Sequence, residues 1–356
     1  VGYNLNGGVL GSSAPTSTNY DSVITIDNPT KTVTVTGNVN GTGATIGSAT
    51  SKAQTFAGWT ASNINTSTAM YGSSSTNVST LWSSTSTKVK SKYFKNLNAT
   101  NNATSTLIAN WTPVSFNLPT VSRTGYNCSW NTKTDGSGTT YTSGASYTPT
   151  STSENLVLYA RCSVNSYKIS YTLKGGTSGS NAPTSASYDS TITIDNPTKT
   201  ITAVGNANGT GATISSSTSK AQTFAGWTAS NLNTSTAKYG SSSTYVNTSW
   251  SSASTKVTSK YFKNLTSTSG ATVTLTANWT VASFKLPTVS KNGYTCNWNT
   301  NSSGTGTTYA SGASFTPTSS TGTTLNLYAK CTASSYKISY TLNGGRSGSS
   351  APTSTN

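Results

Sequence analysis

The sequence predicts a mainly β protein built as a tandem array of small modules. Tyr, Trp and Phe make up 10% of its 356 residues and recur at fixed places, whereas chains that stay unfolded are poor in aromatic residues. Short runs such as 23–26 and 31–36 alternate apolar and polar residues with the period of a strand. Ser, Thr, Gly and Asn fill most other positions and disfavour helices. We therefore expect β-rich modules with thin cores.

The array is visible as an internal repeat. The segment YNLNGG at Tyr3 returns as YTLKGG at Tyr171 and as YTLNGG at Tyr340. Between these anchors TIDNPTKT, AQTFAGWTASN and KYFKNL each occur twice. Two full copies are present with the start of a third, so we expect the sequence to be a window from a longer array.

Each copy divides into a long module and a short one. Long modules are expected over 1–112 and 165–280, short modules over 113–164 and 281–333, and a third long module begins over 334–356. Each starts and ends with a strand pattern, which leaves almost no residues for flexible linkers. Closely coupled modules of this kind are expected to form an extended rod.

Helix is weakly supported except in one segment. Within 78–97, residues such as Trp82, Val89 and Tyr93 have roughly helical spacing, and 246–265 repeats them. A short helix in each long module is therefore an alternative to strands and turns.

The formal net charge of +16 comes from 22 Lys and Arg against 6 Asp and Glu, spread singly along the chain. Such a surface attracts polyanions, including acidic glycans and cell-wall polymers, in a salt-dependent way. A solubilising surface is the simpler interpretation. No basic run or RNA-binding signature indicates nucleic acid as a partner. No segment predicts a signal peptide or a membrane-spanning helix.

No set of residues predicts an active site. The chain has no His, the commonest general base, and no nucleophile motif such as GxSxG. Only Asp21 and Asp27 recur, as Asp189 and Asp195, and they are thin support for a Ca²⁺ site. Turns in which Asp or Asn accepts backbone hydrogen bonds are preferred, and a Lys-to-Asn isopeptide crosslink is an alternative. We expect no enzyme activity, no metal and no cofactor.

Asn-x-Ser/Thr triplets indicate glycosylation only weakly, because a chain rich in Ser, Thr and Asn contains many by chance. Examples lie at Asn65, Asn77, Asn98 and Asn264.

The segment GYNCSWNTKTDGSGTTYTSGASYTP at Gly125, with the closing NLVLYARC, resembles the Listeria–Bacteroides repeat family, which includes the internalin B-type repeats. It returns at Gly293, and the long modules fit the family pattern at Phe56-Ala-Gly-Trp59 and at Leu107-Ile-Ala-Asn-Trp111. The resemblance covers nearly the whole chain. It implies β-grasp-like modules in secreted or surface-attached bacterial proteins, commonly as adhesin stalks, and it supplies no catalytic residues.

The short modules depart from the family pattern at two positions. Cys128 and Cys296 stand where the pattern has Phe, and Cys162 and Cys331 replace the closing Trp. Because the resemblance implies that this Phe and Trp meet in the core, we expect the disulfides Cys128–Cys162 and Cys296–Cys331. Metal binding and free thiols are the alternatives, although two Cys without His make a poor zinc site. Disulfides would place the protein in an oxidising, extracellular setting.

Together these features predict a stalk or fibre of a bacterial cell-surface protein, which acts as a spacer or filament rather than a catalyst. Its expected partners are neighbouring repeats or copies of itself. The alternative is an adhesin module that binds acidic glycans or cell-wall polymers through a basic, aromatic surface, although most aromatic residues sit at core positions of the family pattern.

Overall fold

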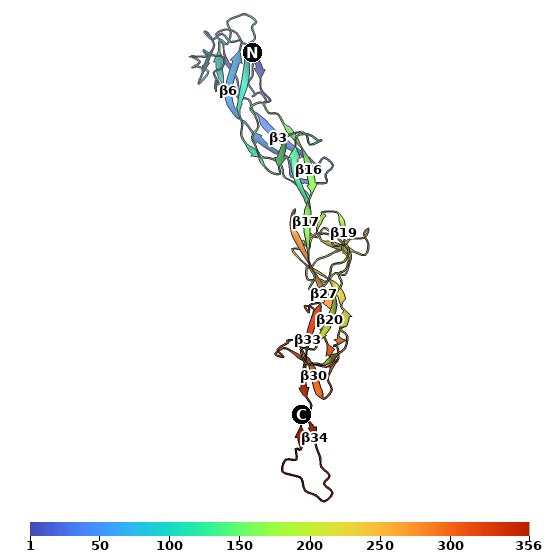
Figure 1. Ribbon diagram of the computed structural model, residues 1–356. Helices are drawn as coiled ribbons and strands as arrows, with labels where there is room; N and C mark the ends of the chain where they lie inside the picture. Colours follow the sequence, from blue (N-terminus) through green and yellow to red (C-terminus); the bar gives the residue numbers. More distant parts are fainter. Residues whose placement is uncertain (356) are drawn as a thin grey trace. The chain divides into compact units, whose positions relative to one another are not determined.

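The computed structural model describes residues 1–355, and every regular element in that range is a β-strand (Figure 1). The expectation of a mainly β protein is confirmed. The chain divides into two compact units, Val1–Ser163 and Val164–Asn356, called here the first and the second unit.

The first unit consists of short strands joined by turns. They form a three-stranded sheet (β1-β10-β6), a four-stranded sheet (β2-β9-β7-β8), a five-stranded sheet (β14-β13-β16-β3-β5) and the pairs β11-β15 and β12-β4. Its strands are β1 (Gly2–Asn4), β2 (Val23–Thr25), β3 (Thr32–Asn38), β4 (Thr45–Ile46), β5 (Thr50–Ala53), β6 (Thr55–Ser62), β7 (Met70–Gly72), β8 (Thr80–Leu81), β9 (Tyr93–Lys95), β10 (Thr106–Thr112), β11 (Phe116–Asn117), β12 (Val121–Ser122), β13 (Tyr126–Asn131), β14 (Thr140–Thr142), β15 (Ser146–Tyr147) and β16 (Leu156–Val164).

The second unit repeats these sheets with small differences. Its sheets are β18-β17-β27-β23, β19-β26-β24-β25 and β22-β20-β33-β30-β31, with the pairs β21-β29, β28-β32 and β34-β35. Its strands are β17 (Ser166–Thr172), β18 (Ser185–Ser187), β19 (Thr191–Thr193), β20 (Thr200–Asn206), β21 (Thr213–Ile214), β22 (Thr218–Ala221), β23 (Thr223–Ser230), β24 (Lys238–Gly240), β25 (Thr248–Ser249), β26 (Tyr261–Lys263), β27 (Thr272–Thr280), β28 (Phe284–Lys285), β29 (Val289–Ser290), β30 (Tyr294–Asn299), β31 (Thr308–Ala310), β32 (Ser314–Phe315), β33 (Thr324–Ala333), β34 (Tyr336–Lys337) and β35 (Ser354–Thr355).

The five-stranded sheet combines strands from two expected modules. Strands β3 and β5 belong to 1–112, whereas β13, β14 and β16 belong to 113–164. Strand β3 pairs with β16 in parallel, with Gly37 opposite Leu158. The division expected at residue 112 therefore does not separate two sheets. The sheet β22-β20-β33-β30-β31 repeats this arrangement in the second unit.

Buried tryptophans mark the two cores of the first unit. Trp59 and Trp82 belong to one cluster, and Trp130 belongs to a second cluster with Val35 and Leu158. All three indoles are at most 1% exposed. Because Val35 lies on β3, the core of the short segment depends on a strand of the long one. A segment of about 50 residues would bury too little apolar surface alone.

The alternative of a helix within 78–97 is wrong. The segment contains the short strands β8 and β9 with turns between them. Trp82 and Val89 are buried, and the Trp82 indole N–H donates to the carbonyl oxygen of Thr87 at 3.2 Å. Ser84 and Ser86 join their hydroxyls at 2.9 Å in the same turn. Local hydrogen bonds of this kind compete with helix formation. The roughly helical spacing of the buried residues therefore comes from strands and turns and not from one face of a helix.

Candidate functional site

The four cysteines form the two expected disulfides, Cys128–Cys162 and Cys296–Cys331. The first joins β13 to β16, and the second joins directly opposite residues of β30 and β33. No cysteine in the described part of the chain is free. The two bonds indicate an oxidising location outside the cytoplasm.

The sheets β1-β10-β6 and β18-β17-β27-β23 show an aromatic counterpart of these bridges. Phe56 on β6 lies directly opposite Trp111 on β10, with ring centroids 5.7 Å apart. Phe224 and Trp279 repeat the pair at 5.9 Å in the second unit. A disulfide in one sheet and an aromatic pair in the other thus link opposite residues of neighbouring antiparallel strands. The cysteines therefore have a structural role here, and the bond leaves no thiolate for metal binding or catalysis.

The recurring aspartates stabilise turns through hydrogen bonds and ion pairs. Asp27 accepts hydrogen bonds from the Ser12 hydroxyl at 2.7 Å and from the Ser13 backbone N–H at 3.1 Å, and pairs with Lys92 at 3.0 Å. The Ser12 hydrogen bond, followed by those from Lys92 and Ser13, lowers the pKa of Asp27 to about 2. Asp195 repeats these contacts with Ser180, Asn181 and Lys260.

The other recurring pair, Asp21 and Asp189, also occupies turns. Both residues have a left-handed backbone, with φ of 66° and 62°. Each receives hydrogen bonds from an asparagine, Asn96 and Asn264 respectively. Within residues 1–355 no group of three or more His, Cys, Asp or Glu side chains is placed to hold a metal ion. Asn264 is 7% exposed, so its triplet is a poor glycosylation acceptor.

We expect the Asp27 contacts to make the stability of the first unit depend on acid pH. The folded pKa of about 2 lies below the ordinary value of 3.8, so the carboxylate stabilises the fold above pH 3.8. This contribution is lost as the pH falls through about 2. Thermal unfolding of the wild type and of Asp27→Asn between pH 2 and pH 6 should give midpoints that differ at pH 6 and converge near pH 2. Parallel curves would contradict the assignment.

A buried lysine is the most unusual side chain in each unit. Lys31 is 3% exposed, and its ammonium group donates to the carbonyl oxygens of Asn6 at 2.6 Å and Ser151 at 3.0 Å. Burial lowers its pKa, and nearby Glu154 opposes that shift. Lys199 repeats the arrangement in the second unit. The lysine therefore ties the loop after the first strand to a loop of the short segment.

Sequence reasoning missed this lysine, although a signal was present. Lys31 is two residues before Val33 and four before Val35, and both valines are fully buried. Because side chains alternate between the two faces of a strand, Lys31 points to the same buried side. Its ammonium group contacts the main chain of Asn6, whose side-chain amide donates instead to the carbonyl oxygen of Ala109 at 2.8 Å. An isopeptide crosslink would require the Lys31 ammonium group to contact a side-chain amide, and these contacts do not provide that arrangement.

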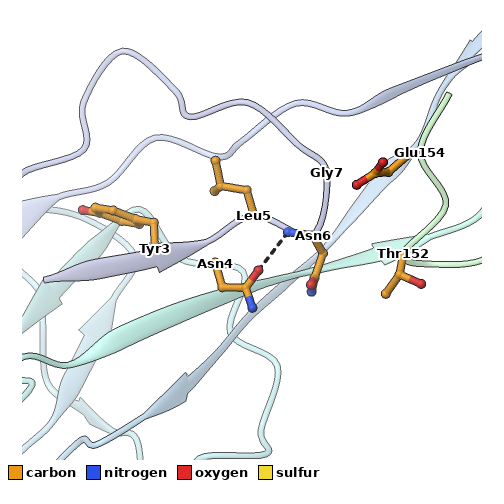
Figure 2. Close-up of a pocket in the computed structure, with 7 residues that line it drawn as sticks. All are labelled: Tyr3, Asn4, Leu5, Asn6, Gly7, Thr152 and Glu154. Carbon is orange, nitrogen blue, oxygen red and sulfur yellow. Dashed lines mark hydrogen bonds between the residues drawn. The ribbon is translucent and has the colours of Figure 1, made fainter.

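A pocket of about 580 Å³ opens beside this loop (Figure 2). It is lined by residues 3–7 together with Thr152 and Glu154, and Figure 2 shows the Glu154 carboxylate facing the turn at Gly7. Burial raises the pKa of Tyr3 to about 12, so its phenol stays protonated at neutral pH. In the second sequence copy, Lys174 and Gly322 stand where the first has Asn6 and Glu154. The pocket's polar groups are therefore not repeated, whereas the buried lysine is.

No protein-family model, curated protein or solved structure matches the chain. The fold and the bonds at its candidate sites define an all-β protein stabilised by disulfides.

Residues 1–355 contain no helix that is long and apolar enough to cross a membrane.

Proposed function

We propose that the chain is a structural spacer, part of the stalk or fibre of a bacterial extracellular surface protein. Its role is to separate or connect other parts of an assembly rather than to catalyse a reaction. Modules repeated in series suit this role, because the length of the array grows with the number of copies.

One observation carries the proposal: the unusual polar side chains that both units share serve to hold the fold. Asn131 is an example. Its side-chain amide donates to the carbonyl oxygens of Gly136 and Gly138, each at 3.1 Å, and its oxygen accepts the N–H of Lys133 at 2.9 Å. Asn299 repeats this pattern in the second unit. The buried lysines and Asp27 with Asp195 are engaged in the same way.

The sequence resemblance supports the same role. Modules of the Listeria–Bacteroides repeat family are β-grasp-like and commonly occur in stalks of surface proteins, and we propose this module type for both units. The opposed aromatic pairs agree with the core contact that the family pattern implies. An extracellular location is consistent with the two disulfides.

Small-angle X-ray scattering of the full chain tests the spacer proposal. A compact protein of 356 residues has a radius of gyration of about 20 Å. A spacer is expected to give a much larger value that does not change with protein concentration. A value near 20 Å would contradict the proposal, as would turnover of a polysaccharide substrate at a rate above the buffer blank.

A further inference from the structure

The outer face of the sheet β19-β26-β24-β25 carries charge that the fold does not require. Tyr239 and Phe262 pack in the core of the second unit. Their chain neighbours Lys238 and Lys263 therefore lie on the opposite face. These lysines are direct partners across β24 and β26. Like charges in directly opposite positions destabilise a sheet, so stability does not explain this pair.

The charge of this face is only partly balanced. Lys263 has Asp189 as its partner at 3.9 Å. Lys238 forms no ion pair with any residue in the described part of the chain. Two ammonium groups therefore stand on directly opposite residues, and only that of Lys263 has a carboxylate as an ion-pair partner, so a ligand that carries negative charge would relieve their repulsion.

Tyr261 lies on the same face as the lysines, and the main chain of Tyr245 crosses this face. Tyr261 is two residues before Lys263 and directly opposite Gly240. A Cβ atom on Gly240 would overlap the carbonyl oxygen of Tyr245, so the main chain of Tyr245 crosses this face above Gly240. The Tyr245 side chain is 57% exposed. Aromatic rings beside ammonium groups offer both a stacking surface and charge.

Hydroxyl groups complete the row. Thr191 lies opposite Lys263, and Ser249 lies opposite Lys238. The row Thr191–Lys263–Lys238–Ser249 crosses four strands and spans about 14 Å, or three strand spacings. A polymer that carries both carboxylates and hydroxyls could make contacts along this whole length.

The first unit provides an internal reference. The equivalent row is Val23–Lys95–Met70–Leu81. The main chain of Asn77 crosses above Gly72, as that of Tyr245 crosses above Gly240. Lys95 is paired with Asp21 at 3.3 Å. The same sheet therefore exists in a version with balanced charge, fewer hydroxyls and one tyrosine fewer.

We propose that this face of the second unit, the Lys238 face, binds an acidic polysaccharide. Carboxylates of the polymer contact Lys238 and Lys263, a sugar ring lies against Tyr245 or Tyr261, and sugar hydroxyls reach Thr191 and Ser249. The inference does not depend on the spacer function, because a stalk can also bind a polymer along its side.

Binding of oligogalacturonate to the full chain, measured by isothermal titration calorimetry at low salt, tests this site. The wild type is expected to bind with one site per chain, while a neutral dextran of the same length does not bind. Lys238→Met and Tyr245→Asn copy the residues of the first unit, so the fold should accept them. Each is expected to weaken binding about five- to tenfold, equivalent to roughly 1 to 1.4 kcal/mol.

Lys88→Met is the matched control, because it removes one charge from an exposed position of the first unit. It should change the affinity less than twofold. The pair Met70→Lys and Asn77→Tyr should raise the stoichiometry to two sites. Equal losses in Lys88→Met and Lys238→Met would show a nonspecific attraction and overturn the site, as would the absence of wild-type binding. Neither result bears on the scattering test of the spacer.

Discussion

Joint replacement of Cys128 and Cys162 by alanine is expected to lower the free energy of unfolding of the first unit by about 4 kcal/mol. The bridge closes a loop across a sequence separation of 34 residues, and its loss frees that loop in the unfolded chain. The effect should fall on the five-stranded sheet, because the bridge joins β13 to β16. Hydrogen exchange of peptides from these strands, followed as a function of urea, measures the change where it occurs.

The second unit supplies the control for this experiment. Cys296→Ala with Cys331→Ala opens a loop with a sequence separation of 35 residues, so a similar loss is expected in β30 and β33. The first-unit variant should leave those strands unchanged. Reduction of the wild type with a thiol should reproduce both losses. A change below about 1 kcal/mol in β13 and β16 would contradict a stabilising role for the bridge.

The strands and the disulfides could be predicted because their signals are local or repeated. Alternation over 31–36 is visible in the sequence, and β3 occupies Thr32–Asn38. The cysteines occur at the same two places in both copies, and the pairing could be expected because the resemblance to the repeat family implies that these two places are in contact. In the long modules the corresponding aromatics, Phe56 and Trp111, do lie opposite each other.

The origin of the five-stranded sheet could not be predicted, because its key contact is long-range. Strand β3 belongs to the segment 1–112 but pairs in parallel with β16 of the short segment, so Val35 lies opposite Leu156 despite their large separation in the sequence. An alternating strand shows which residues are buried but not which strand covers them. Parallel pairing needs a long crossover connection, so it leaves no turn signal between the partners.

The Lys238 face shows the same limit. The exchange of Met70 for Lys238 between the two copies is visible in the sequence. That Lys238 lies beside Lys263, and Tyr245 above Gly240, follows only from the strand register and the path of the turn. Composition indicated a basic and aromatic surface, whereas the register is needed to locate it.

Trp130→Ala is expected to destabilise the first unit by about 3 to 5 kcal/mol. The indole is fully buried, and its N–H donates to the carbonyl oxygen of Pro119 at 2.7 Å. It also packs on Gly37 of β3, where a Cβ atom would overlap the ring. Urea unfolding followed by hydrogen exchange should show the loss in β3 as well as in β13. Leu81→Ala, at a residue that is 44% exposed, should cost far less.

A double-mutant cycle tests whether the contact between Trp130 and Gly37 joins the two segments. Gly37→Ala should destabilise the wild type, because the added methyl group has to displace a buried ring. In the Trp130→Ala background the ring is absent, so the same methyl group enters the cavity and its cost should nearly vanish. The coupling energy is then expected to reach about 1 to 3 kcal/mol. Additive effects would mean that the contact between Trp130 and Gly37 does not join the two segments, and would leave the backbone pairing of β3 with β16 and the packing of Val35 as the links between them.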